Sequence, residues 1–334
     1  MIYSMPALRT ATAAPRLARL STTTLAIVAL AGAAALWGTS FVAAKVVLAE
    51  IPPVTLACLR FVIAALVLLP LTWWSGGRPV FSRDAALLGL TGVSLFFLCQ
   101  YAGLRLASAA DATLILGGAL PLLTTLLGFV VLEEKLDRWQ LGGLACSLLG
   151  AGIVALTSGE SRGGSTPLGL GLLFLAAASG AVAFVVGRRV FRGPRLMPTL
   201  AGSTVYGVLF LVPAVAFELR GAGMAMPSER ALFVLLYLGA GCSALAFALW
   251  AYGLRHLTAT QNALVSNLEL PIGLLAALLL GEALGWGHLA GAPLIVAGAV
   301  LAAAAPRQEH GRSDAGRATQ PGSPPRSTPA PLLE

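Results

Sequence analysis

Residues 252–271 read YGLRHLTATQNALVSNLELP, and a more apolar version of this stretch occurs 150 residues earlier in the chain. Under that shift, seven residues meet an identical residue at 102–121, including the Gly-Leu-Arg near the start and the Leu-Pro at the end. The later copy carries Asn262, Ser266 and Glu269, whose spacings of four and three residues place them on one face of a helix. The chain therefore contains an internal repeat, and its polar copy is expected to form one wall of a substrate path through a membrane.

The composition indicates the class of protein. Of 334 residues, 57% are hydrophobic and 11% are charged, whereas a soluble globular domain carries about 25% charged residues. Disorder is excluded because apolar residues are too abundant. The chain is therefore expected to be an all-α integral membrane protein in a lipid bilayer. Basic cytoplasmic loops explain its net charge of +8. The sequence has no basic patch interleaved with aromatic residues, so we do not expect it to bind nucleic acid.

Ten apolar runs have roughly the length of a membrane-spanning helix. They cover residues 24–48, 54–74, 85–106, 110–132, 139–157, 168–187, 198–219, 231–254, 257–280 and 288–305. The first run is expected to remain as a helix, because the preceding cytoplasmic tail, residues 1–23, lacks the order of a cleaved signal peptide. The tail at 306–334 is rich in Pro, Ser, Arg and Gly and is expected to be disordered.

The distribution of Lys and Arg predicts the orientation. If the N-terminus is cytoplasmic and the segments alternate, sixteen of these residues fall on the cytoplasmic side and four on the outer side. This excess predicts that both termini lie in the cytoplasm. The expected location is the cell inner (plasma) membrane, with multiple spans.

The repeat divides the ten helices into two halves of five, residues 24–157 and 168–305, joined by an extracytoplasmic linker at 158–167. Because five is odd, the second half enters the membrane from the opposite side. Two inverted repeats are typical of secondary transporters, with the substrate site near the midplane between them.

Further motifs follow in matching order in the two halves. They are WGTSF at 37–41, LRF at 59–61, Pro121 with Gly128 and EKL at 134–136, Pro271 with GEAL at 281–284, and the pairs Gly143/Gly150 and Gly291/Gly298. On these residues, from about 24 to 305, the chain resembles the drug/metabolite transporter superfamily, specifically its EamA-type ten-helix exporters. The resemblance implies export of a small metabolite, amino acid or drug by alternating access, driven by a proton or substrate gradient. In one departure, Leu270 separates Glu269 from Pro271, where the family often places its acid next to the proline.

Glu269 is the only acid predicted near the middle of the membrane. Such a group is costly there and usually faces a cavity or a partner. We interpret it either as a protonation or cation-recognition site, or as half of a structural ion pair with Arg60. Arg60 is itself a candidate for binding a substrate carboxylate, and the alternative is a snorkelling or paired structural role.

Six further residues complete the predicted substrate site. Trp37 and Ser40 share a helix face, as do Ser243 and Trp250, and aromatic residues can line a cavity. The additional candidates are Trp37, Ser40, Tyr101, Trp250, Asn262 and Ser266. Lys45 is interpreted as a snorkelling residue, and Asp111 as a helix cap or a substrate contact.

Other function classes have little support in the sequence. A membrane-embedded enzyme needs a nucleophile with a base, or metal ligands, at a workable spacing, and the chain has no HExxH or GxxxxGK[ST] motif. We therefore predict no catalytic residue, no metal and no cofactor. A receptor or scaffold that transports nothing is the other alternative. The predicted partners are a small-molecule substrate, the lipid bilayer and protons, and a homodimer is compatible with the sequence.

Overall fold

The structure is a computed structural model that describes residues 21–132, 137–157, 165–191, 195–222 and 226–303. All regular secondary structure in these ranges is helical. Eight helical segments are long and apolar enough to cross a membrane, and two shorter apolar segments, at 264–279 and 286–301, bring the number to ten. The expected all-helical fold with ten spans is thus confirmed. The predicted C-terminal tail and most of the N-terminal tail lie outside the described residues.

Each half contains five spans, and the third span of each is built from three consecutive segments. The first half consists of α1 (Thr22–Leu48), α2 (Pro53–Trp74), α3 (Arg83–Leu88) with η1 (Gly89–Leu95) and α4 (Phe96–Arg105), α5 (Ala109–Leu132) and α6 (Arg138–Thr157). The second half consists of α7 (Pro167–Phe191), α8 (Leu196–Ala222), α9 (Glu229–Leu236) with η3 (Tyr237–Leu245) and α10 (Ala246–His256), α11 (Ala259–Ser266) with α12 (Glu269–Leu279), and α13 (Trp286–Ala303).

Matching serines start the third span of each half. Ser82 Oγ accepts the N–H of Ala85, and Ser228 Oγ accepts the N–H of Ala231, both at 3.2 Å. Such a cap satisfies an N–H group that the first helical turn leaves without a partner. The same local signal therefore begins the same element in both halves.

The π-helical segments η1 and η3 occupy equivalent places in these two spans. In each segment a serine hydroxyl donates to the carbonyl oxygen five residues earlier. Ser94 donates to Gly89 and Ser243 donates to Leu238, both at 3.0 Å. Short π-helical turns inside α-helices occur frequently at functional sites, so η1 and η3 are natural places to look for one.

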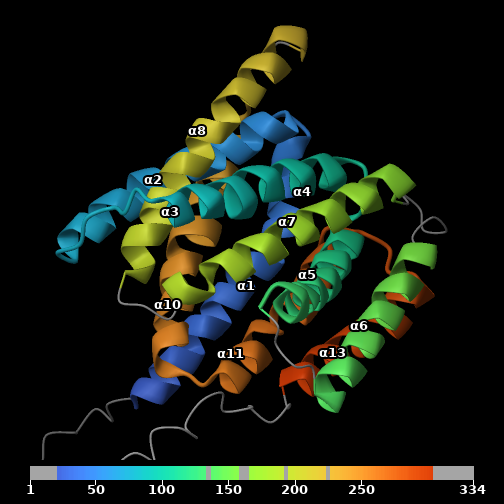
Figure 1. The fold of residues 1–334 in the computed structure, drawn as a ribbon. Helices are drawn as coiled ribbons and strands as arrows, with labels where there is room; N and C mark the ends of the chain where they lie inside the picture. Colours follow the sequence, from blue (N-terminus) through green and yellow to red (C-terminus); the bar gives the residue numbers. More distant parts are fainter. Residues whose placement is uncertain (1–20, 133–136, 158–164, 192–194, 223–225, 304–334) are drawn as a thin grey trace, which may run out of the picture.

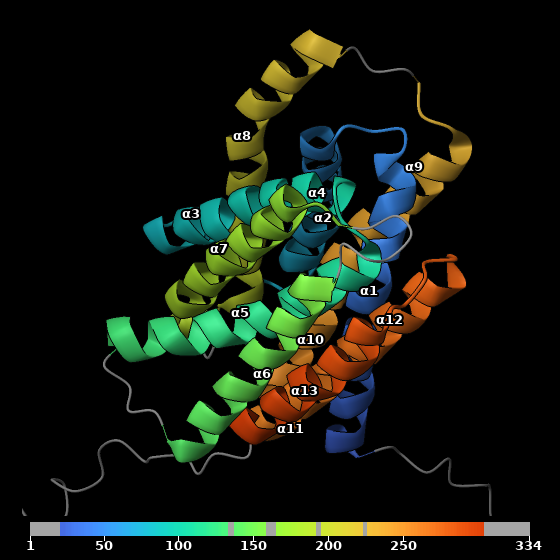
Figure 2. The ribbon, with the colours of Figure 1, turned by 90° about the vertical axis from the view of Figure 1, so that its right-hand side faces the viewer.

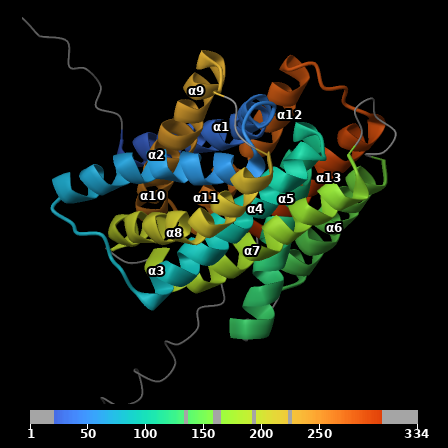
Figure 3. The same ribbon diagram turned by 90° about the horizontal axis from the view of Figure 1, so that it is seen from above.

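The two halves interleave (Figures 1 and 2). α1 packs against α10 and α12 of the second half, and α7 packs against α4 and α5 of the first half. α6 and α13, the last spans of the two halves, lie side by side (Figure 3). The start of α1 and the end of α13 lie at the same end of the molecule (Figure 2). We call the opposite end, where α1 ends and α2 begins, the distal end.

The ninth span corrects one expectation. The sequence predicts a continuous helix over 257–280, whereas the structure divides it into α11 and α12 with a turn at 267–268. The physical reason is Pro271, which has no N–H to donate to the carbonyl oxygen of Asn267. That oxygen accepts the N–H of Leu270 instead, at 3.2 Å. The candidate acid of this span is therefore the first residue of α12, not the middle of a helix.

Glycines allow α6 and α13 to lie in close contact. A Cβ atom built on Gly150 would lie 2.7 Å from the carbonyl oxygen of Gly291, and one built on Gly291 would lie 2.7 Å from that of Gly150. Small residues let the backbones of membrane helices approach in this way. Gly152, two residues further along α6, has nothing within 4 Å of such a Cβ atom. On α6, Gly150 is therefore packed against α13, whereas Gly152 has free space beside it.

Alanine at these two positions should affect the stability of the protein differently. Gly150→Ala should lower the free energy of unfolding by about 1–3 kcal/mol, because the two helices must move apart. Gly152→Ala should leave it unchanged or raise it by up to about 1 kcal/mol, because alanine favours a helix and meets no neighbour there. Thermal unfolding of both purified variants measures the difference, and equal melting temperatures would contradict the packing argument.

Candidate functional site

One arginine side chain lies inside the helix bundle and is held by residues from two other spans. Arg60, on α2, is 2% exposed. Its Nε donates to Ser243 Oγ at 2.7 Å, its Nη1 to Tyr101 Oη at 2.5 Å and its Nη2 to the carbonyl oxygen of Cys242 at 3.2 Å. Tyr101 is on α4, and the other two partners are in η3 of the second half. Arg60 therefore connects the two halves of the protein.

The partners of Arg60 are all electrically neutral. Among the described residues, no carboxylate oxygen lies within 4.0 Å of its guanidinium nitrogens. The guanidinium lies near the ring of Phe97 instead, with 4.6 Å from Cζ to the ring centroid, which is a favourable cation–π contact. A buried charge without a counter-charge carries a large desolvation cost. The site is therefore suited to an anionic ligand.

Packing alone does not require an arginine at this place. A Cβ atom built on Gly239 would lie 2.8 Å from the carbonyl oxygen of Arg60, and one built on Gly89 would lie 2.5 Å from that of Ser203. Ser203 is thus the structural counterpart of Arg60 in the other half. The same contact between spans forms at Ser203 without a charged side chain. The charge of Arg60 is therefore not needed for this contact, which favours a role for it in binding.

The indole of Trp37 shares a hydrogen-bond acceptor with Arg60. Its Nε1 donates to the Cys242 carbonyl oxygen at 3.1 Å, so this oxygen accepts from both side chains. The centroid of the Trp37 ring lies 6.3 Å from that of Trp250. Four predicted site residues are thus brought together around η3: Trp37, Arg60, Tyr101 and Trp250.

Three residues differ from their predicted importance. Ser40 is buried, and its hydroxyl donates to the Trp37 carbonyl oxygen within its own helix at 2.7 Å, so it stabilises α1 locally. Ser243 entered the sequence argument only as a neighbour of Trp250, yet it is a direct partner of the guanidinium. Cys242 was missed because it contributes a backbone carbonyl, which leaves no signal in the identity of the residue. The paired π-helical turns are the structural feature that points to it.

The other predicted residues lie where the ninth span is broken. Asn262 is 8% exposed, and its Nδ2 has no hydrogen-bond partner within the described ranges, and neither has Nδ2 of Asn267. Ser266 and Glu269 are partly buried. A buried amide without a partner is costly and calls for a polar ligand or water. The break therefore forms a second polar group of residues inside the bundle.

α1 connects this second group with the arginine. Gly38 directly follows Trp37, and a Cβ atom built on it would lie 2.7 Å from the carbonyl oxygen of Glu269. No ion pair joins Glu269 to Arg60 in the described part of the chain, so the structure does not support the structural pair, which is one of the two interpretations of Glu269. Arg60 and Glu269 thus lie near α1 at two different places, Arg60 beside Trp37 through their shared acceptor and Glu269 beside Gly38.

Three glutamates at the distal end have structural roles, because their carboxylates accept hydrogen bonds at the starts of other helices. Glu218 accepts two backbone N–H groups at the start of α2 at 3.1 and 2.8 Å, and Glu282 accepts two at the start of α5 at 2.9 and 3.0 Å. Glu50 accepts the N–H and the hydroxyl of Ser228, and these hydrogen bonds hold the pKa of its carboxyl below the ordinary value. Lys45 Nζ lies 3.5 Å from Glu282 Oε1, so its snorkelling interpretation is corrected to an ion pair.

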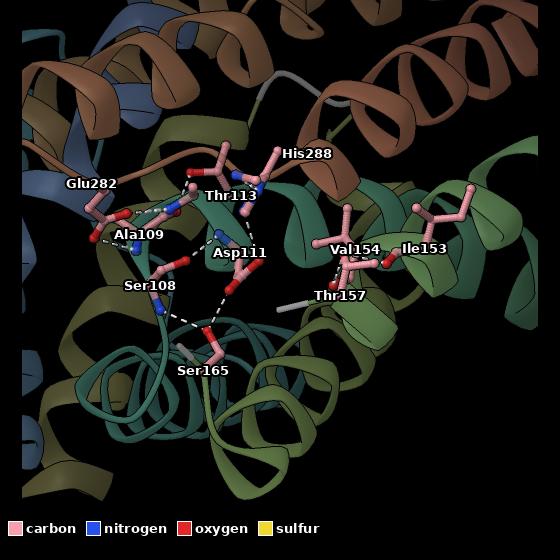
Figure 4. Close-up of polar contacts among 12 residues, drawn as sticks. Ser108, Ala109, Asp111, Thr113, Ile153, Val154, Thr157, Ser165, Glu282 and His288 are labelled. Carbon is pink, nitrogen blue, oxygen red and sulfur yellow. Dashed lines mark hydrogen bonds and ion pairs between the residues drawn. The ribbon is translucent and has the colours of Figure 1, made fainter. Parts of the chain in front are cut away.

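Asp111 also has a structural role (Figure 4). Its Oδ1 lies 3.0 Å from His288 Nε2, and its Oδ2 accepts from Ser165 Oγ at 2.5 Å. The cap of α5 is Ser108, whose Oγ accepts the Asp111 N–H at 2.9 Å. The expected role of Asp111 as the cap is therefore corrected, because Ser108 is the cap and the Asp111 carboxylate is held by His288 and Ser165. The pair of Asp111 and His288 links α5 of the first half to α13 of the second half.

Comparisons with known proteins agree with this architecture. The sequence model of the "EamA-like transporter family" matches residues 24–156 and, a second time, residues 167–304. The chain is 30% identical over 249 residues to the "Probable biotin transporter" of Pseudomonas aeruginosa, which covers 73% of this chain and 83% of that relative. It is 30% identical over 274 residues to the "Probable amino-acid metabolite efflux pump" of Salmonella typhimurium, covering 78% of this chain and 89% of the relative. A solved crystal structure shares the fold with a TM-score of 0.60 at 22% identity, covering 83% of this chain and 96% of that one.

Proposed function

Because this chain belongs to the EamA-like transporter family, we propose that it is a secondary active carrier that exports a small molecule bearing a carboxylate. The observation that carries the proposal is the buried guanidinium of Arg60, whose partners in the described part of the chain are all neutral. In the proposed mechanism the two inverted halves rock against each other, so that the site between them faces one side of the membrane at a time.

The unused N–H groups of Arg60 support a carboxylate as the ligand. A guanidinium has five N–H groups, and the protein uses one on each of the three nitrogens. One N–H therefore remains on each terminal nitrogen, and two such groups can meet the two oxygens of a carboxylate. The two relatives at 30% identity are named for biotin and for amino-acid metabolites. Biotin and amino acids both carry a carboxylate.

The polar residues of the broken span are proposed to bind the rest of the substrate and the coupling proton. The free amides of Asn262 and Asn267 support the first role. Glu269 supports the second, because it has no ion-pair partner among the residues that the structure describes, and an acid inside a membrane span without a counter-charge is a natural proton acceptor. The sixteen-to-four distribution of Lys and Arg supports cytoplasmic termini in the inner membrane. In this orientation the distal end faces outward.

Purified protein in liposomes tests the function. The liposomes are loaded with a mixture of amino acids and biotin, a proton gradient is imposed, and mass spectrometry identifies what leaves. At least one carboxylate should leave faster than from liposomes without protein. Its methyl ester should leave no faster with the protein than without it, and it should not compete. Binding without flux would favour a receptor, and equal flux of acid and ester would contradict the assigned role of Arg60.

A further inference from the structure

A groove of about 420 Å³ lies at the distal end of the molecule, between α1, α9 and the end of α12. Its walls are largely apolar, with Val42 on α1, Phe233 on α9 and Leu279 on α12, and Arg230 is the charged residue among those that line it. α9 and α12 both pack against α1. α1 therefore forms the floor of the groove, and α9 and α12 flank it on either side.

Two hydroxyl groups in this groove are hydrogen-bonded to each other. Tyr237 Oη lies 2.6 Å from Thr39 Oγ1, and both residues line the groove. The Thr39 hydroxyl donates its own proton to the carbonyl oxygen of Ala35 at 2.8 Å, so it accepts the proton of Tyr237. This hydrogen bond joins η3 of the second half to α1 of the first half.

The arginine site includes residues of the same two elements as this hydrogen bond, α1 and η3. On α1, Trp37 precedes Thr39 by two residues. In η3, Cys242 follows Tyr237 by five residues, which is the hydrogen-bonding interval of a π-helix. The carbonyl oxygen of Cys242 accepts from both Trp37 and Arg60, and Cys242 is 0% exposed. The same two elements thus carry the hydroxyl pair on the groove side and the guanidinium site behind it.

We propose that this groove is the distal half of the substrate path and that the Tyr237–Thr39 hydrogen bond separates it from Arg60. The inference rests on the proposed carrier function and names the substrate class more closely, as a carboxylate with an apolar part. The apolar part is accommodated by the aliphatic and aromatic walls, while Arg230 at the distal rim attracts the anion. When the hydrogen bond breaks, η3 and α1 separate and the groove becomes continuous with the guanidinium.

Cys242 reports this opening without any knowledge of the substrate. In a background of Cys58→Ala, Cys99→Ala and Cys146→Ala, it is the remaining cysteine. A membrane-impermeant maleimide applied to intact cells should label it slowly. Thr39→Val should raise the labelling rate by up to about tenfold, the population change expected when one hydrogen bond is lost. Tyr237→Phe should raise it as well, and this variant also removes the contact between the Tyr237 hydroxyl and the Cys242 thiol.

Tyr206→Phe is the matched control, because Tyr206 lies on α8, outside the groove, and stacks on Phe210 with 6.1 Å between ring centroids. It should leave labelling of Cys242 unchanged. Unchanged labelling in both Tyr237→Phe and Thr39→Val would overturn the gate, as would an equal increase in Tyr206→Phe. Labelling only from the cytoplasmic side of inverted vesicles would overturn the assignment of the groove to the outer half.

The substrate class has its own test. Val42→Trp fills the groove, so in the flux assay it should weaken competition by leucine more than competition by glycine, which has no apolar side chain. Equal weakening would contradict an apolar subsite. The labelling and flux results separate the two proposals. If labelling is unchanged but flux depends on Arg60, the gate is wrong and the carrier function stands. If labelling becomes faster but no flux is observed, the carrier function is wrong.

Discussion

Replacing Arg60 with glutamine should lower carboxylate export by on the order of 100-fold, because losing one partner of a buried, hydrogen-bonded charge pair costs about 2–5 kcal/mol. Glutamine is polar and can keep a hydrogen bond to Tyr101 or Ser243, but it has no charge for the substrate. The protein should still be produced, because the counterpart position in the other half holds Ser203 in the same contact between spans. Flux at low substrate concentration, normalised to the amount of inserted protein, measures the effect.

Two variants separate charge recognition from a structural role of Arg60. Arg60→Lys keeps the charge but loses the planar fork of donors, so its flux should lie between those of the parent and Arg60→Gln. Arg105→Gln removes an exposed arginine at the end of α4 and should leave flux near the parent value. If Arg60→Gln and Arg60→Lys both reduce the amount of folded protein as strongly as they reduce flux, Arg60 is structural and the carboxylate proposal fails.

Glu269→Gln should give a normally inserted protein whose transport is reduced by about 10- to 100-fold and no longer depends on pH, because an acid held inside a membrane span exchanges protons or binds charge. Glutamine keeps the size of glutamate and much of its hydrogen bonding, but it takes up no proton. Substrate flux measured over a series of pH values, with and without an imposed proton gradient, tests this. A parent-like pH profile would remove Glu269 from the coupling mechanism.

The position of Glu269 requires a control for its effect on the helix itself. Because it is the first residue of α12, its negative charge also interacts favourably with the helix dipole, by typically 0.3–1 kcal/mol. Glu229 is the first residue of α9 and is exposed, so Glu229→Gln removes the same contribution at the membrane edge. If the two variants have the same small effect on flux, Glu269 acts only at the start of its helix.

The sequence by itself determined the class, the number of spans and the repeat. These properties follow from quantities that lie along the chain. An apolar run must match the thickness of the bilayer, and an odd number of spans in each half inverts the second half. The offset of 150 residues between the two copies is visible without any coordinates. The ten spans and the two halves of the structure agree with these expectations.

The sequence also identified residue types that are costly in lipid, and this recovered part of the candidate site. Arg60, Tyr101, Trp37 and Trp250 do lie around one π-helical segment. A charged or polar side chain inside an apolar span must find a partner or a ligand. The amino-acid type is therefore informative even when the partner is unknown.

Only the tertiary structure decided which partner each group has. It showed that, within the described ranges, no carboxylate lies beside Arg60. It also showed that Asp111 pairs with His288 and that Tyr237 is hydrogen-bonded to Thr39. The partners of Arg60 in η3 are 182 and 183 residues away along the chain, and one of them is a backbone carbonyl. Hydrogen bonds select partners by distance and direction between spans. Local periodicity records neither, because it describes only the face of a helix on which a residue lies.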